Sequence, residues 1–387
     1  MRKVLKRNVL SSVRQSVLEV FSRGLQTMKA WQINQFGEQL SSVLFLNDAA
    51  KRPSIRKPDD VLVRVSASSV NLLDVYMCKG YGHSLMQCLS LLSELRFPNE
   101  TLDRFPLTFG RDFSGVVIDK GESVTKYKVG DCVWGVSSVH EPGTHSEYIC
   151  VPQLNISEKP ANISHVDAAS LPFAALTAWS AICTFGGLNR HNTFGKRVLV
   201  LGGTGGVGTV AIQLLKSWGA FVVTTCSSDA IEWITHVAKV DECVDYKSNS
   251  LSIFERSFDL VLDFAKRDQT NSLDTTVLRT LKKNCLYVTL NTPLVRCFDE
   301  GGLILGSASA AAKAVDSTAK GMREGVGVRW AHFYPNAAAL QSLKEKIEKG
   351  ELHAVVDKVY KFEQLEHAYT KVYSGHARGK TVIQVSE

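Results

Sequence analysis

The pattern with the most specific chemistry in this sequence is a glycine-rich run at residues 202–208, GGTGGVG. Its spacing, Gly203-x-Gly205-x-x-Gly208, suits a loop around a pyrophosphate. The first glycine allows a tight turn, the second lets backbone N–H groups approach the phosphates, and the third lets helix and strand pack closely. A strand-like run, Val198–Leu201, precedes the loop and a helical pattern follows it. The pattern therefore predicts a dinucleotide-binding loop rather than a glycine-rich turn without a ligand. The residues expected to contact the dinucleotide are Thr204, Gly205, Gly206, Val207 and Gly208.

The choice of dinucleotide depends on the end of the second strand, about 20 residues beyond the glycines. A carboxylate there accepts hydrogen bonds from the ribose of NAD and repels a 2′-phosphate. This sequence has Thr225-Cys226-Ser227-Ser228, and its first carboxylate is at Asp229. We therefore predict NADPH, with Ser227 and Tyr246 beside the 2′-phosphate and Lys247 as a neighbouring cation. The alternative for Ser227 is an ordinary surface serine.

The elements that must position this loop follow two patterns. From Met28 to about Cys150, short apolar runs between turn residues predict the strands of a small barrel. After Asn189, strand-like and helical runs alternate, which predicts βαβ units and a parallel sheet. The expected strands of that sheet are 198–201, 221–225, 243–246, 259–264 and 285–291, with helices ending at Trp218 and near Lys239. A helix over 341–349 and a strand over 381–385 follow.

The net charge of +7 on 387 residues is unevenly distributed. Residues 1–27 contain six basic side chains and only one acidic side chain, Glu19, so this segment holds most of the excess. It is also rich in serine, and its apolar residues have helical spacing, as in a mitochondrial transit peptide. The sequence therefore predicts a transit peptide and the mitochondrial matrix, with an ordinary N-terminal helix as the alternative. Because the remainder is nearly neutral, a nucleic-acid-binding surface is not expected.

The nine cysteines are scattered and include no C-x-x-C pair, which argues against a disulfide framework or a zinc knuckle. One uncharged stretch, Ala168–Leu188, has the length of a membrane span. Because it contains Pro172 and a Gly-Gly pair, we interpret it as a buried helix and expect no transmembrane span.

Several ordered motifs carry a family resemblance over nearly all of residues 28–387. They are Asn71-x-x-Asp74-x-Tyr76, Gly110-Arg111-Asp112, Val129-Gly130-Asp131, Leu176-Thr177-Ala178-Trp179, the glycine loop and Gly379-Lys380-Thr381-Val382. With these motifs the chain resembles the medium-chain dehydrogenase/reductases, and within them the zinc-free quinone oxidoreductases related to ζ-crystallin.

The resemblance implies an α/β fold, a GroES-like β-barrel catalytic domain plus a doubly wound Rossmann cofactor domain. The expected organisation is a transit peptide over 1–27, the catalytic domain over 28–160, the Rossmann domain over 161–335 and a C-terminal return to the catalytic domain over 336–387. Members of the family often pair through their cofactor domains, so the resemblance also implies a homodimer.

Departures from the zinc-dependent branch decide the expected chemistry. Where those relatives have a cysteine ligand this chain has Asn71, and where they have Gly-His-Glu it has Gly110-Arg111-Asp112. A tetrahedral zinc site needs three or four sulfur, imidazole or carboxylate ligands that these positions do not supply. We therefore predict no metal.

The resemblance also implies the site residues. Asn71 and Tyr76 are the expected catalytic residues, because they match the cleft motif of the family, and Tyr81 is expected to line the same cleft. The alternative for Asn71 and Asp74 is a turn and capping role. Further cofactor contacts are expected from Leu290, Phe333, His376, Ala377 and Arg378, with Arg378 available to the pyrophosphate or the 2′-phosphate. A solvated loop cation is the alternative for Arg378.

Two hypotheses for function follow. The first is a mitochondrial NADPH-dependent reductase of a quinone or a conjugated enone, with ubiquinone or a ubiquinone precursor as the acceptor suggested by the location. Such acceptors delocalise the developing charge, so they need no metal. The second is an NADPH-binding scaffold that acts through mitochondrial protein partners and has only vestigial activity. For residues 82–104, where the resemblance thins, we expect either a helix over the cleft or a partner surface, with a core-packing helix as the default.

Overall fold

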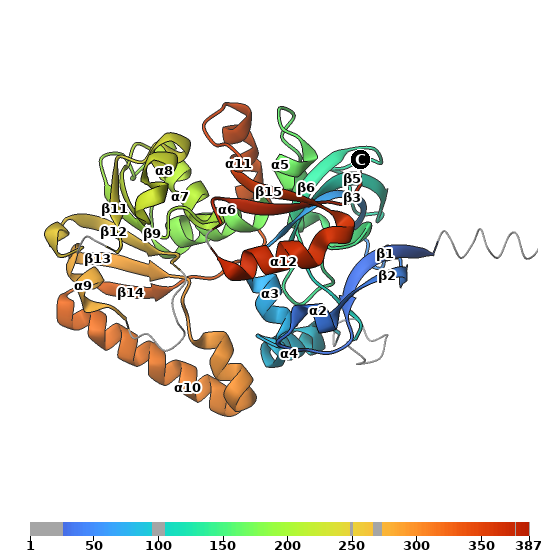
Figure 1. Ribbon diagram of the computed structural model, residues 1–387, viewed down its shortest axis with the longest axis horizontal. Helices are drawn as coiled ribbons and strands as arrows, with labels where there is room; N and C mark the ends of the chain where they lie inside the picture. Colours follow the sequence, from blue (N-terminus) through green and yellow to red (C-terminus); the bar gives the residue numbers. More distant parts are fainter. Residues whose placement is uncertain (1–25, 95–104, 248–250, 266–272, 376, 387) are drawn as a thin grey trace, which may run out of the picture.

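The computed structural model describes residues 26–94, 105–247, 251–265, 273–375 and 377–386. The predicted transit peptide therefore lies almost entirely outside the described residues, as does His376. Figure 1 shows two lobes, one around a parallel sheet and one around antiparallel strands.

The lobe predicted to be the catalytic domain, called the catalytic lobe here, contains two sheets. The smaller has the order β2-β1-β4, with β1 Thr27–Ile33, β2 Leu44–Lys51 and β4 Leu107–Thr108. The larger has the order β15-β16-β3-β5-β6-β8, and β7 also pairs with β3. Its strands are β3 Asp60–Val70, β5 Asp112–Lys120, β6 Cys132–Val136, β7 Tyr148–Pro152, β8 Ile156–Glu158, β15 Val356–Lys361 and β16 Lys380–Gln384. The final strand β16 thus pairs with β3, which brings the end of the chain back to the N-terminal lobe.

The cofactor lobe is a six-stranded sheet with the order β11-β10-β9-β12-β13-β14. All of its pairings are parallel. The strands are β9 Arg197–Leu201, β10 Phe221–Cys226, β11 Glu242–Asp245, β12 Phe258–Asp263, β13 Leu281–Thr289 and β14 Gly327–Trp330. In sequence order this is 3-2-1-4-5-6, the Rossmann topology, whose ligands bind beyond the carboxyl ends of the strands. The predicted fold class is confirmed, although the domain limits at residues 160 and 335 stay predictions.

The helices connect and cover these sheets. They are α2 Leu40–Val43, α3 Leu72–Cys78, α4 His83–Glu94, α5 His165–Ala169, α6 Pro172–Trp179, α7 Gly206–Ser217, α8 Ile231–Ala238, α9 Thr275–Arg279, α10 Leu294–Glu324, α11 Ala337–Glu348 and α12 Leu365–Ser374. The uncharged stretch at 168–188 folds into the buried helix α6 and a π-helical segment, Ser180–Phe185. Among the described residues, no helix is both long and apolar enough to cross a membrane.

Strand β14 and helix α10, the longest helix described, were not predicted from the sequence patterns. Helix α10 bends at Gly302, whose φ of 61° and ψ of −162° are not helical. Figure 1 shows α10 running below the parallel sheet toward α4, which it contacts. It thereby joins the cofactor lobe to the predicted helix at the start of residues 82–104.

Candidate cofactor and active site

The glycine loop connects β9 to α7, and its glycines serve different purposes. Gly202 has a φ of 79°, so it makes the turn that the sequence analysis assigned to Gly203. At Gly203 the constraint is packing, because a Cβ there would lie 2.0 Å from Thr224 Oγ1. A Cβ on Gly208 would lie 2.3 Å from the carbonyl oxygen of Gly202, which confirms the close packing of helix and strand. The turn prediction was therefore wrong by one residue.

The middle of the loop is open enough for a ligand. Beside Gly205, the nearest atom to an added Cβ would be the Gly202 carbonyl oxygen at 3.7 Å. Helix α7 begins at Gly206, and the first N–H groups of a helix have no partner within it. Together with the positive end of the helix dipole, these groups form an anion site. The loop therefore fits a dinucleotide pyrophosphate, as predicted for Thr204–Gly208.

The C-terminal segment crosses this loop. Gly379 forms a parallel bridge with Gly205, and its N–H donates to the Thr204 carbonyl oxygen at 3.0 Å. A Cβ on Gly206 would lie 2.5 Å from Cδ of Lys380. The predicted residues Ala377 and Arg378 precede this crossing directly, so they lie at the glycine loop although they are about 170 residues away in the sequence.

Arg378 continues from the crossing to the end of β10. Its Nη2 lies 2.5 Å from Oδ2 of Asp229 and donates to the Asp229 carbonyl oxygen at 3.1 Å. A hydrogen bond from the Ser227 hydroxyl is the first cause that lowers the pKa of the Asp229 carboxyl, and Arg378 is the second. The structure thus gathers Ser227, Asp229 and Arg378 where the sequence predicts a 2′-phosphate. Tyr246, 57% exposed, stands next to the end of β11, and its N–H donates to the Cys226 carbonyl oxygen.

Leu290 and Phe333 lie at the other end of the predicted dinucleotide site, beyond β13 and β14. Both pack against the same hydrophobic core, and the ring of Phe333 lies 4.2 Å from that of Phe173 at the start of α6. The N–H of Phe173 in turn donates to a carboxylate oxygen of Asp112. Phe333 is therefore linked through Phe173 to the polar cluster that contains Asn71.

Asn71 stands at the N-terminus of α3 and has partners both inside and outside the turn. Its backbone N–H donates to Oδ2 of Asp74 at 2.8 Å, so the capping role is real. Its side-chain amide donates to Oδ2 of Asp112 at 2.8 Å and accepts from Nζ of Lys380 at 2.5 Å. The amide is therefore held from two sides, as a group that orients a ligand must be.

Lys380 is the site residue that sequence reasoning missed. It was part of a family motif, but its role could not be assigned. The side chain is buried, with Nζ bonded to Asn71 and 3.4 Å from Oδ2 of Asp112, while its aliphatic stem lies against Gly206. Lysine is seldom buried without a partner, and Lys380 has its partners in the polar cluster of Asn71 and Asp112. Through Lys380, this predicted catalytic cluster is joined to the glycine loop.

The Arg111 side chain fills the place where, by the resemblance, zinc-dependent relatives have a histidine. It is fully buried, donating from Nη1 to the carbonyl oxygens of Ser138 and Glu141, and its Nε lies 3.6 Å from Oδ1 of Asp74. Burial raises the pKa of Asp74 and lowers that of Arg111, and the attraction between them offsets both shifts. Within the described ranges no three His, Cys, Asp or Glu side chains are grouped to hold a metal. The absence of a metal stays a prediction.

Tyr76 of α3 and Tyr81, which precedes α4, lie together with ring centroids 5.9 Å apart. Burial, followed by the charge of Asp299, raises the pKa of Tyr81. Asp299 belongs to α10, and its carboxylate accepts hydrogen bonds from the N–H groups of Gly82 at 2.7 Å and Ser84 at 3.2 Å. Helix α10 thereby fixes the start of α4 beside the two tyrosines.

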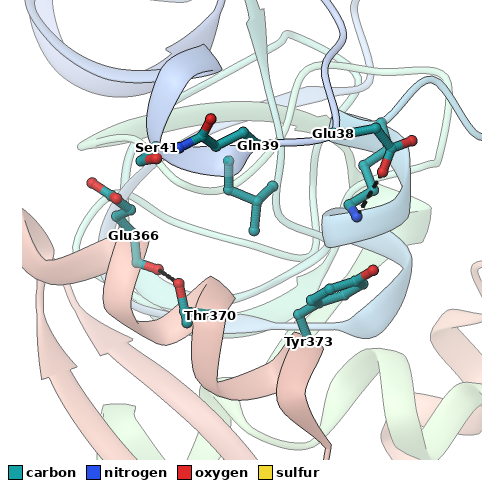
Figure 2. Close-up of a pocket in the computed structure, with 8 residues that line it drawn as sticks. Glu38, Gln39, Ser41, Glu366, Thr370 and Tyr373 are labelled. Carbon is teal, nitrogen blue, oxygen red and sulfur yellow. Dashed lines mark hydrogen bonds and ion pairs between the residues drawn. The ribbon is translucent and has the colours of Figure 1, made fainter.

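A separate surface pocket of about 230 Å³ lies on the catalytic lobe (Figure 2). Lys79 lines this pocket. Its Nζ lies 2.9 Å from Oε2 of Glu38 and 4.0 Å from the centroid of the Tyr373 ring. Its lining residues are Glu38, Gln39, Leu40, Ser41, Lys79, Glu366, Thr370 and Tyr373. They come from α2 and the two residues before it, from α12, and from the residue after α3, so this pocket is distinct from the glycine loop and the Asn71 cluster.

Fold and site define a two-lobed oxidoreductase that binds a nicotinamide dinucleotide. The family model of the alcohol dehydrogenase GroES-like domain matches residues 57–161, and that of the zinc-binding dehydrogenases matches residues 238–383. The chain belongs to the medium-chain dehydrogenase/reductase superfamily, as its motifs suggested.

Within the superfamily, the chain is similar to a particular mitochondrial protein. It is 40% identical over 363 residues to NAD(P)H oxidoreductase RTN4IP1, mitochondrial, of Bos taurus, covering 92% of this chain and 89% of that relative. It is 36% identical over 369 residues to reticulon-4-interacting protein 1, mitochondrial, of Caenorhabditis elegans, covering 94% and 97%. The solved quinone oxidoreductase of Coxiella burnetii matches with 26% identity and a TM-score of 0.75, covering 93% of this chain and all of that one.

Proposed function

We propose that this protein is an NADPH-dependent reductase that transfers hydride to a quinone or a conjugated enone without a metal. The observation that carries the proposal is the contact between the two halves of the site: Lys380 packs on the glycine loop and also holds the amide of Asn71. A cofactor loop and an oriented hydrogen-bond donor are thereby placed next to each other. The similarity to a quinone oxidoreductase supports the choice of acceptor.

When bound, the nicotinamide ring supplies the hydride. The chain's own groups then act on the acceptor. We assign the remaining N–H of the Asn71 amide and the hydroxyl of Tyr76 to the acceptor oxygen, where negative charge develops. The buried ammonium of Lys380 keeps the Asn71 amide in one orientation and supplies positive charge nearby. Donors fixed before the reaction stabilise developing charge without reorganisation. A quinone or enone delocalises that charge, so no Lewis acid is required.

The preference for NADPH is supported at the end of β10. Ser227 is uncharged, and the carboxylate of Asp229 is bonded to the Arg378 side chain, so the local cation offsets the local anion. Arg378 could then share its guanidinium between Asp229 and a 2′-phosphate, since it has five N–H donors. Tyr246 and Lys247 border the same edge.

The place of action is part of the proposal. The named relatives are mitochondrial, and the basic segment at 1–27 has the composition of a transit peptide. We therefore propose the mitochondrial matrix, with ubiquinone or a ubiquinone precursor as the acceptor. A homodimer paired through the cofactor lobes is the expected assembly.

The decisive experiment is an acceptor screen. A protein starting near Leu25 is mixed with NADPH and short-chain quinones or enals, and the loss of NADPH absorbance is followed. We expect turnover with at least one acceptor class, and a strongly reduced kcat in Asn71→Ala with an unchanged NADPH Kd. Metal analysis accompanies the screen. One zinc per chain would overturn the metal-free mechanism. The absence of turnover with every acceptor would overturn the proposal that the protein is a quinone or enone reductase.

A second candidate is a scaffold that binds NADPH and acts through protein partners. It is favoured by the exposed aliphatic side chains after the bend of α10, Leu303, Ile304 and Leu305. The relative in Caenorhabditis elegans, reticulon-4-interacting protein 1, is named for a protein partner. Exposed aliphatic clusters often mark interaction surfaces. Tight binding of NADPH with no turnover on any acceptor would favour this scaffold over the reductase.

A further inference from the structure

Two cysteines face each other at the adenosine end of the site. Cys226 is the last residue of β10, and Cys243 lies on β11, the edge strand of the parallel sheet. In the register of the two strands, Cys243 pairs with Thr224, two residues before Cys226. Side chains two apart on a strand share a face, as do directly paired residues, so both thiols lie on one face as diagonal neighbours. The two side chains also perturb each other's pKa: Cys226 lowers the pKa of Cys243, and Cys243 raises that of Cys226.

The two thiols differ in a way that suits oxidation. Cys226 is 3% exposed, whereas Cys243 is only partly buried and its Sγ lies 3.5 Å from Oγ1 of the exposed Thr235. The interaction with Cys226 is the main cause that lowers the pKa of Cys243 to about 7, while the same interaction raises the pKa of Cys226. Cys243 is thus the more acidic of the two thiols, and the thiolate is the reactive form of a cysteine.

We propose that Cys226 and Cys243 form a reversible redox site that closes to a disulfide when a hydroperoxide oxidises it. The Cys243 thiolate attacks one oxygen of hydrogen peroxide, the O–O bond breaks, and hydroxide leaves, giving a sulfenic acid at Cys243. The sulfur of Cys226 then attacks Cys243, the S–O bond breaks, and water leaves with the Cys226 proton. In sum, two thiols and one peroxide give a disulfide and two waters, and the sulfurs lose two electrons.

Closing the bond must move the edge strand. Diagonal neighbours on ideal strands have Cα atoms about 8 Å apart, from a strand spacing of about 4.8 Å and a rise of about 3.3 Å per residue. A disulfide spans about 4.4–6.8 Å between Cα atoms. Strand β11 is paired only on its β10 side within the described sheet, so it can slide along β10 and shorten this diagonal. The disulfide is therefore coupled to a shift of β11 rather than formed in place.

This shift reaches the proposed NADPH site through Asp245. Asp245 is paired with Cys226 in the register, and its Oδ2 accepts the hydroxyl of Ser228 at 2.6 Å. Its Oδ1 accepts the N–H of Lys247 at 2.9 Å. Moving β11 thus moves Ser228, the residue after Ser227, together with Lys247. This consequence rests on the proposed cofactor site, and we expect the disulfide to weaken NADPH binding.

The redox site is tested first without the cofactor. The full chain is treated with hydrogen peroxide, its remaining thiols are alkylated, and the peptides are mapped by mass spectrometry. We expect one peptide pair linking Cys226 to Cys243, lost on reduction with dithiothreitol and absent from Cys243→Ser. Cys132→Ser, which removes an exposed thiol elsewhere, should leave the link intact. A link to another cysteine, or sulfinic acid at Cys243 with Cys226 reduced, would overturn the proposal.

The effect on the cofactor is measured separately. We expect the Kd for NADPH to rise about tenfold in the oxidised protein and to recover on reduction, which corresponds to about 1.4 kcal/mol. The Kd of Cys243→Ser should not respond to peroxide. A disulfide that forms without any change in Kd would contradict the coupling. If reduced protein binds no NADPH, the proposed function fails while the peptide map still decides the redox site.

Discussion

The two ends of the predicted cofactor site are held by opposite means. At the adenosine end, Arg378 and Asp229 form an ion pair whose side chains are 40% and 72% exposed. At the predicted catalytic end, called the catalytic end here, Lys380 and Asp112 form an ion pair whose side chains are 8% and 0% exposed. Arg378 and Lys380 are separated by a single residue, Gly379, so one short segment supplies a cation to each end.

The difference shows which end the fold depends on. An exposed pair is screened by water and contributes little to stability. A buried pair is costly to form, but removing one partner leaves an uncompensated charge in the interior. We therefore expect the catalytic end to be coupled to folding, whereas the adenosine end should be free to respond to the ligand.

The largest expected effect comes from removing the buried cation. Lys380→Met should lower the free energy of unfolding by about 3–5 kcal/mol, because Asp112 then keeps a buried charge without its cation. Ser69, Asn71 and the N–H of Phe173 still donate to Asp112, so the protein should remain folded at low temperature. Urea titrations followed by circular dichroism measure the change.

Arg378→Met is the matched control for this comparison. It removes the cation two residues before Lys380, and the carboxylate that loses its partner, Asp229, is exposed to water. The urea midpoint should therefore barely move. Equal losses of stability in the two variants would show that the ends do not differ in the way their burial suggests.

The catalytic end should also respond to acid. His145 is fully buried, with Nδ1 3.1 Å from the hydroxyl of Tyr369 and Nε2 3.2 Å from the Ser69 carbonyl oxygen. Burial is the main cause that lowers its pKa from 6.5 to about 3; Arg111 and Lys380 lower it further, and Asp112 opposes them. Below pH 6.5 the unfolded chain takes up a proton at His145 that the folded chain does not.

The stability that neutral His145 contributes is therefore complete above pH 6.5 and is lost as the pH falls toward 3, by up to about 1.4 kcal/mol per pH unit. We expect His145→Gln to unfold more easily at pH 7 but to lose less stability than the unchanged protein between pH 7 and pH 5.5. The pH dependence is the readout, since other groups titrate equally in both proteins. Parallel curves for the two proteins would contradict a neutral buried histidine.

A pair of glycine substitutions separates packing from ligand approach. Gly208→Ala should destabilise the fold by about 1–3 kcal/mol, because its Cβ would lie 2.3 Å from the Gly202 carbonyl oxygen. Gly205→Ala should leave stability nearly unchanged, because the nearest atom is 3.7 Å away, but it should weaken dinucleotide binding by occupying the open side of the loop. Thermal unfolding and NADPH titration of both variants test this. Normal NADPH affinity in Gly205→Ala would place the pyrophosphate elsewhere.

The elements that the sequence predicted are those with a local signal. The strand, glycine loop and helix at 198–218 were found because adjacent residues determine them, and the sheet strands followed from the alternation of patterns. Helix α10 was missed because Gly301, Gly302, Gly306 and Gly321 interrupt its sequence and weaken its intrinsic helix propensity. Its tertiary contacts with α4 and β14, together with the Asp299 bonds, are not visible in a local pattern.

The same limit applies to the site. Asn71 and Arg378 were predicted from motifs, but the partner of Asn71 is a lysine 309 residues away. Nothing in the strand 380–384 distinguishes Lys380 from a solvated lysine, since its burial depends on β16 pairing with β3. Likewise, the spacing of the scattered cysteines gave no sign that Cys226 and Cys243 lie on one face of two paired strands.

The smallest expected effect tests whether the adenosine end responds to the ligand alone. Arg378→Met should raise the Kd for NADPH by about tenfold, because a charge-assisted hydrogen bond to the 2′-phosphate is lost, while the Kd for NADH should change little. Arg378→Lys keeps the charge without the forked geometry, so it should fall between the two. Isothermal titration calorimetry with NADPH and with NADH measures the Kd of each variant for both dinucleotides. Equal loss of NADPH and NADH binding would assign Arg378 to the pyrophosphate, which both share, and not to the phosphate that distinguishes them.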